Sequence, residues 1–171
     1  DPHTPYDPPR NGYAFAGDRP DLTPVLEKAK TFRHSRTFPF GARDHLSDNL
    51  LNRVIKLYDA EIRYVDGQLE QLVAQLESTG NLDPNDWLFV MSDHGEEFQE
   101  HQQWGHGQSL FQEQLHVPLL VLGPQATPGH RIKNPVNLID VHATLVGISG
   151  LKQTLANSPA IPLQPLLLKS S

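Results

Sequence analysis

Residues 87–95, WLFVMSDHG, place a short apolar run directly before the polar sequence Asp-His-Gly. Such a run, bounded at once by polar residues, is typical of a strand that is buried on both faces. Ligands of layered α/β domains usually bind at the ends of such strands, where side chains first reach a crevice. The stretch therefore predicts an α/β fold in which Asp93 and His94 lie at a candidate site.

A long amphipathic helix is predicted before this strand. Apolar residues from Leu51 to Leu76 recur at intervals of three and four, which places them on one stripe of a helix and makes that stripe a candidate core surface. Ser47 or Asp48 would cap the start of the helix, and Gly80 would end it.

The chain after the Asp-His-Gly sequence contains weaker patterns. An apolar run at 117–122 predicts a second strand, and a less apolar one at 136–139 predicts a third. Asp140 is expected to cap a closing helix over 141–148. Residues 1–45 are rich in Pro, Gly, Arg and Asp without sustained periodicity, so we expect them to be mostly irregular.

The composition excludes several classes of protein. The 171 residues fit one domain, and 37% hydrophobic residues suffice for a core. No run approaches the roughly 18 apolar residues that a membrane-spanning helix needs. A formal charge of −6 without a basic stripe argues against a nucleic-acid partner. The absence of cysteine excludes disulfides and a cysteine nucleophile within the chain.

Asp93 and His94 are candidate metal ligands. Gly95 allows a sharp turn after the strand, so both side chains could reach one cation. A carboxylate and an imidazole suit a divalent metal, and the pair alone would accept Ca, Mn, Mg or Zn. An Asp-His dipeptide is common, however, and Asp44-His45, which follows no strand, is interpreted as an ordinary turn.

The surrounding sequence resembles the sulfatase family of the alkaline phosphatase superfamily. The resemblance rests on SDHGEEF (92–98), GHG (105–107) and VPLL (117–120). YDAEIRYVD (58–66) is similar to the family's long helix before the metal strand, and HTPYDPP (3–9) to an upstream histidine loop.

The resemblance implies an alkaline-phosphatase-like layered fold, with a central, mostly parallel sheet flanked by helices. Residues 1–171 would form the C-terminal portion of the catalytic domain. Residues 1–45 would be its irregular substrate-side segment, and residues 46–171 would supply the helix, the metal-ligand strand and the remaining sheet.

The same resemblance implies a metal-dependent sulfuric ester hydrolase and gives roles to four residues. Asp93 and His94 match the family's second pair of metal ligands, for which calcium is usual. His106 matches a position that contacts the sulfate and assists the leaving oxygen, and His3 matches a histidine that hydrogen-bonds the sulfate or the bridging oxygen. An imidazole near neutral pH can supply the proton that such a departing oxygen needs.

Other parts of the family's site are expected outside this chain. The formylglycine nucleophile and an Asp-Asp pair of metal ligands have no counterpart here, so the chain alone is expected to be inactive. Its partners would be the N-terminal part of the same domain and a sulfated small molecule or glycan. A periplasmic or secreted location would fit the family.

Two alternative functions stay open. A phosphonate or phosphate ester hydrolase, or a phosphoethanolamine-type transferase, of the same superfamily would share the Asp-His-Gly-Glu and Gly-His-Gly segments. An inactive fragment with only a structural or binding role is an alternative of another class.

The remaining polar residues of the segment are interpreted without a role in the chemistry. We expect Glu96, Glu97 and Glu100 to form a solvated acidic face. Trp104 is expected to bury its ring against the loop. The remaining histidines of interest are interpreted as packing or surface residues: His101, His116 and His142.

Overall fold

The fold was obtained as a computed structural model, which divides the chain into two compact units. One unit comprises Asp1–Leu82 and His94–His116, and the other comprises Asp83–Asp93 and Val117–Ser171. Each unit is described by itself. The described residues are 2, 3, 6, 8, 9, 46–107, 109–124, 126–151 and 158–167. Most of the predicted irregular segment, including Asp44-His45, lies outside them.

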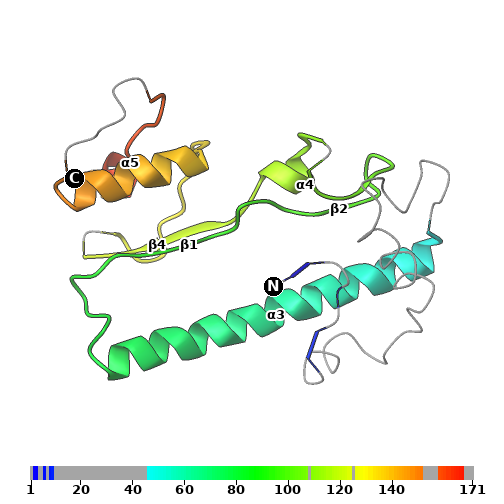
Figure 1. The fold of residues 1–171 in the computed structure, drawn as a ribbon, viewed down its shortest axis with the longest axis horizontal. Coiled ribbons are helices and arrows are strands. Elements are labelled where there is room, and N and C mark those ends of the chain that lie inside the picture. The colour runs from blue at the N-terminus through cyan, green and yellow to red at the C-terminus, as the bar shows by residue number, and fades with distance from the viewer. Residues whose placement is uncertain are drawn as a thin grey trace. The chain divides into compact units, whose positions relative to one another are not determined.

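The predicted long helix is confirmed as α3, Asp48–Ser78, which Figure 1 shows as one uninterrupted helix of the first unit. Ser47 has an extended backbone at the N-cap. At the other end, Gly80 adopts a left-handed φ of 70°. The N–H groups of Gly80 and Asn81 then donate to the carbonyls of Glu77 and Leu76 at 3.1 and 2.9 Å. This paired arrangement ends the helix because it satisfies carbonyls that the last turn leaves unpaired.

The core of the first unit lies on the N-terminal half of α3. The buried residues Val54 and Leu57 pack there with Tyr6, Phe98 and Trp104. The ring centroids of Tyr6 and Phe98 are 5.6 Å apart, and those of Phe98 and Trp104 are 5.4 Å apart. The prediction that Trp104 buries its ring is confirmed.

The C-terminal half of the helix does not continue this core. Leu72, on the same predicted stripe, is 50% exposed, and the buried residues of α3 lie between Val54 and Glu61. The prediction that the whole stripe is core therefore holds only for its first half within the described residues. Periodicity identifies an apolar face but not which part of that face finds packing partners.

A small hairpin follows the Asp-His-Gly sequence, in a segment for which the sequence predicted no strand. Strands β2, Glu97–Phe98, and β3, Trp104–Gly105, pair antiparallel. Their connection uses left-handed backbone at Gln99 and Gln102, with φ of 71° and 64°. The short helix α4, Gln112–Leu115, follows. These elements are too short for periodicity to reveal, since each spans only a few residues.

The second unit contains the two stronger predicted strands. These are β1, Leu88–Met91, and β4, Leu119–Leu122, and they pair antiparallel with Leu88 opposite Leu122 and Met91 opposite Leu119 (Figure 1). The prediction that the first strand is buried on both faces is wrong for this chain, because Met91 is 43% exposed. Both strand pairs of the described residues are antiparallel, so the predicted parallel pairing is not among them.

The third predicted strand, at 136–139, is wrong. Leu138 and Ile139 instead begin α5, Leu138–Ile148. Asp140 stands at the third position of this helix, and its carboxylate accepts a hydrogen bond at 2.8 Å from the N–H of Asn137. Asp140 thus caps the helix, as predicted, but from inside its first turn.

A hydrogen-bond network joins α5 to the segment before the short helix α6, Gln164–Leu167. The fully buried Thr144 hydroxyl donates to the Asp140 carbonyl at 2.6 Å and accepts from the N–H of Leu163 at 2.8 Å. The Asp140 carboxylate also accepts from the N–H of Ile161 at 2.8 Å. The C-terminal segment is therefore attached to α5 through side chains.

Replacing Thr144 by valine is expected to lower the free energy of unfolding by about 1–3 kcal/mol, because it leaves the buried N–H of Leu163 without its acceptor. Chemical denaturation followed by circular dichroism would measure the change. Ser149→Ala is the matched control, since that exposed hydroxyl only donates to the carbonyl of Val146. Equal stability of the two variants would contradict the assigned role of Thr144.

None of the helices in the described residues has the length and apolar character needed to cross a bilayer.

Candidate functional site

The candidate site of the first unit begins at a turn that only glycine fits. The N–H of Gly95 donates to the carbonyl of Gln114 at 2.9 Å, which brings the two backbones together. A Cβ atom at position 95 would lie 2.1 Å from the carbonyl oxygen of Glu113. The absence of a side chain at Gly95 thus permits the close approach of this backbone to that of residues 113–114. This approach sets the course of the chain through residues 94–96.

His94 is oriented by its neighbouring peptide. Its Nδ1 lies 3.0 Å from the carbonyl oxygen of Gly95. Because a carbonyl only accepts, Nδ1 carries the proton and the lone pair of the neutral ring is on Nε2. A histidine that binds a metal through one ring nitrogen usually donates the N–H of the other to a carbonyl or carboxylate in this way.

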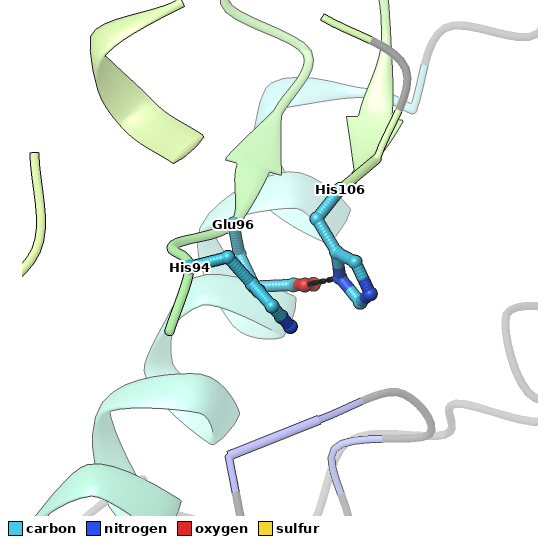
Figure 2. Close-up of side chains that lie close together, drawn as sticks. All are labelled: His94, Glu96 and His106. Carbon is cyan, nitrogen blue, oxygen red and sulfur yellow. Dashed lines mark hydrogen bonds and ion pairs between the residues drawn. The ribbon is translucent and has the colours of Figure 1, made fainter. Parts of the chain in front are cut away.

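Glu96 is buried in this site, so the prediction that it belongs to a solvated acidic face is wrong. One carboxylate oxygen accepts a hydrogen bond from the Tyr6 hydroxyl, and the other accepts one from Nδ1 of His106. Figure 2 shows the Glu96 carboxylate pointing toward the His106 ring, with His94 beside them. These two donors, of which Tyr6 lies 90 residues away in the sequence, offset the cost of removing this carboxylate from water.

Two other histidines of the first unit lie against His106. The ring centroids of His94 and His106 are 3.7 Å apart, with the planes stacked at 25°. His3 meets His106 edge-on, at a centroid distance of 5.2 Å. His3, His94 and His106 were all singled out from the sequence, and the fold places them in one cluster.

Tyr58 packs against Tyr6 and Phe98, beside this cluster. Its ring centroid lies 5.6 Å from that of Tyr6. Burial raises the pKa of the Tyr58 hydroxyl, and the negative charge of Glu96 raises it further. The hydroxyl therefore stays protonated across the neutral pH range and adds no charge to the site.

Glu97 is also fully buried, so the prediction of a solvated face is wrong for it too. Its carboxylate accepts hydrogen bonds from the N–H of His101 at 3.0 Å and from the Gln114 amide at 3.2 Å. The Gln114 side chain in turn accepts from the N–H of Gly107 at 2.9 Å. Glu97 thus fixes the backbone beside His106 without contacting its ring.

The other residues named in the sequence analysis are exposed or stack on a neighbouring ring. Glu100 is exposed, as predicted, and its carboxylate accepts from the N–H of Phe98 at 2.5 Å. His101 stacks on Phe111 with ring centroids 3.5 Å apart, which confirms a packing role. His116 and His142 are exposed. Asp93 is exposed and belongs to the second unit, so its convergence with His94 on one cation stays a prediction.

Two residues of the cluster, Glu96 and Tyr6, were not given a role from the sequence. A signal for Glu96 existed: side chains two residues apart in an extended segment share a face, so Glu96 was a candidate neighbour of His94. Tyr6 offered no such signal, because 90 residues separate it from Glu96.

The donors of the cluster fit a divalent metal. His94, Glu96 and His106 each offer a ligand atom, and these atoms lie within 4.8 Å of one another. Imidazole and carboxylate groups together suit borderline divalent cations. The two Glu96 oxygens are already used by Tyr6 and His106, which leaves the imidazole of His94 as the donor best arranged for an ion.

Comparisons of the sequence with known proteins match it to sulfatases. A protein-family model described as Sulfatase matches residues 1–151. Arylsulfatase K of Danio rerio is 35% identical over 121 residues, and that of Xenopus laevis is 37% identical over 114 residues. These matches cover 70% and 67% of this chain but only 23% and 21% of the relatives. The chain therefore spans less than a quarter of their length.

Two solved structures show the same fold. A phosphonate monoester hydrolase from Silicibacter pomeroyi superposes with a TM-score of 0.73 over 97% of this chain and 35% of that protein, at 24% identity. A protein in complex with its substrate D-glucosamine-2-N,6-O-disulfate superposes with a TM-score of 0.55 over 91% of this chain and 31% of that one, at 21% identity. Both likenesses confirm the predicted α/β fold class.

Proposed function

Because this chain belongs to the sulfatase family, we propose that it supplies part of a divalent-metal-dependent site that hydrolyses sulfate monoesters. The observation that carries the proposal is the cluster of His3, His94 and His106 beside the buried carboxylate of Glu96. Transfer of a sulfuryl group spreads negative charge over its oxygens, and imidazoles that converge on one point can stabilise that charge.

Sulfatases generally use a divalent metal, and we propose that Asp93 and His94 hold it here, with calcium as the ion. The orientation of His94 through the Gly95 carbonyl supports this assignment. The bound ion would supply positive charge to the sulfate oxygens. Calcium is usually coordinated by six or more oxygen atoms, so the proposal includes further ligands from outside this chain.

The two remaining histidines are proposed to act on the ester itself. His106 would give a proton to the departing oxygen, and His3 would hydrogen-bond the sulfate or the bridging oxygen. The exposed position of His3 and its edge-on contact with His106 support a place at the mouth of the site. The nucleophile, a formylglycine, is proposed to lie outside this chain, which contains no cysteine.

The substrate class and the location belong to the same proposal. A sulfated small molecule or glycan would be bound, and the protein would act in the periplasm or after secretion. Family membership supports both statements, and the shape of the substrate loops decides which organic group is accepted.

Turnover of nitrophenyl sulfate by the intact protein tests the function. We expect hydrolysis that is lost on treatment with a chelator and restored by added calcium, because the ion stabilises charge on the transferred group. Nitrophenyl phenylphosphonate is the comparison substrate. Faster turnover of the phosphonate would favour the phosphonate hydrolase alternative, and turnover of neither ester would favour a structural or binding role.

A further inference from the structure

We propose that Glu96 is the positioning residue for His106, and that Tyr6 holds Glu96 in place. This inference rests on the proposed function, because it states how the His106 imidazole is presented to a sulfate ester. All three residues belong to the first unit. Glu96 does not contact the ester in this proposal and acts only through His106.

The hydrogen bonds of Glu96 determine which nitrogen of His106 faces away from it. An ionised carboxylate only accepts, so Nδ1 of His106 must carry the proton of their shared bond. Nε2 is then the nitrogen presented to the substrate. The His106 ring also stacks on the ring of His94, with 3.7 Å between the centroids. This contact restricts rotation of the His106 ring away from its hydrogen bond to Glu96.

The Tyr6 hydroxyl restricts Glu96 in the same manner. It donates to the second carboxylate oxygen, so each oxygen has one donor and the plane of the carboxylate is set. The Glu96 side chain is 2% exposed, whereas that of His106 is 30% exposed. The carboxylate is therefore shielded from water while the imidazole remains accessible, which is the arrangement of a buried orienting group behind an acid.

The arrangement accounts for proton transfer without a change at Glu96. The step begins from the imidazolium form of His106, which carries a proton on each nitrogen. As the bond between sulfur and the bridging oxygen breaks, the proton on Nε2 passes to the departing oxygen, and the sulfuryl group passes to the nucleophile. The ring is left neutral with its proton on Nδ1, still bound to Glu96. A hydrogen bond that is present before and after the step needs no reorganisation during it.

Nitrogen NMR of the His106 ring in the intact protein tests the geometry directly. Wild-type protein is expected to carry the proton of the neutral ring on Nδ1. Glu96→Gln is expected to lose this preference, because its amide can donate to Nδ1. Glu70→Gln, which removes an exposed carboxylate of α3, is the matched control and should retain it. A wild-type ring protonated on Nε2 alone would overturn the inference.

Kinetics with two leaving groups separate positioning from a general structural role. Glu96→Gln is expected to lower kcat about 10- to 100-fold for an alkyl sulfate, whose leaving oxygen needs a proton, and much less for nitrophenyl sulfate. Tyr6→Phe should show the same pattern with a smaller loss. Equal losses on both esters would overturn the inference, since a distorted site would not distinguish leaving groups.

The metal content of the Glu96 variant distinguishes a positioning residue from a metal ligand. Glu96→Gln is expected to bind as much metal as wild-type protein, and loss of the ion would overturn the positioning role by making Glu96 a ligand. The tautomer of His106 is measured without substrate. If wild-type protein hydrolysed no sulfate ester, the proposed function would fail while the geometric assignment could still be judged.

Discussion

Replacing His106 by alanine is expected to lower kcat for an alkyl sulfate by about 10²- to 10⁴-fold, the usual contribution of a positioned general acid. This corresponds to about 3–5 kcal/mol of transition-state stabilisation. His106 contacts His3, His94 and Glu96, so it stands at the centre of the cluster. Steady-state kinetics with the intact protein would measure the loss.

The matched control is His116→Ala, which removes an exposed histidine of the same unit. Its kcat is expected to equal that of wild-type protein. Added imidazole should restore part of the activity of His106→Ala, because its protonated form can occupy the space of the missing ring and donate the proton that the leaving oxygen needs. Wild-type kcat in His106→Ala would contradict the proposed role of this histidine.

Replacing Gly95 by alanine is expected to destabilise the first unit by about 3 kcal/mol, the upper part of the range for overpacking. The added Cβ would meet the carbonyl oxygen of Glu113 at 2.1 Å, and backbone cannot move aside as a side chain can. The hydrogen bond from Gly95 to Gln114 would lengthen as a result. Denaturant unfolding would give the change in free energy.

Gly67→Ala offers a control with the opposite sign. Gly67 lies within α3, and nothing lies within 4 Å of a Cβ atom at that position. Alanine there is expected to stabilise the protein by about 0.5–1 kcal/mol, because glycine carries an entropic cost in a helix. If both glycine variants changed stability by the same amount, the close approach at Gly95 would not be the cause.

Local patterns predicted the elements whose signals are long. Helix α3 begins after Ser47 and ends before Gly80, as the apolar spacing and Gly80 indicated, because periodicity and helix ends are properties of neighbouring residues. The Ser47 side chain itself makes no capping hydrogen bond. The strands β1 and β4 were predicted from short continuous apolar runs, which are also local signals. The error at 136–139 is also local: its apolar residues are too few to distinguish a strand from the first turn of α5.

The acidic residues of the site show where local patterns fail. Glu96 and Glu97 look like solvated residues in the sequence, yet both are buried, because each finds hydrogen-bond donors elsewhere in the chain. Whether a carboxylate can leave water depends on those donors and not on its neighbours in sequence. Position 96, two residues after His94, hinted at a shared face but could not reveal Tyr6.

The sequence by itself indicated the α/β class through its apolar pattern, and it indicated the family and the expected histidines through motifs that resemble those of sulfatases, because motifs and patterns are read along the chain. Only the tertiary structure decided that His3 and His94 meet at His106 and that Tyr6 and Glu96 stand behind it. The physical reason is the distance along the chain: contacts across 90 residues arise from packing on α3, which no local pattern encodes.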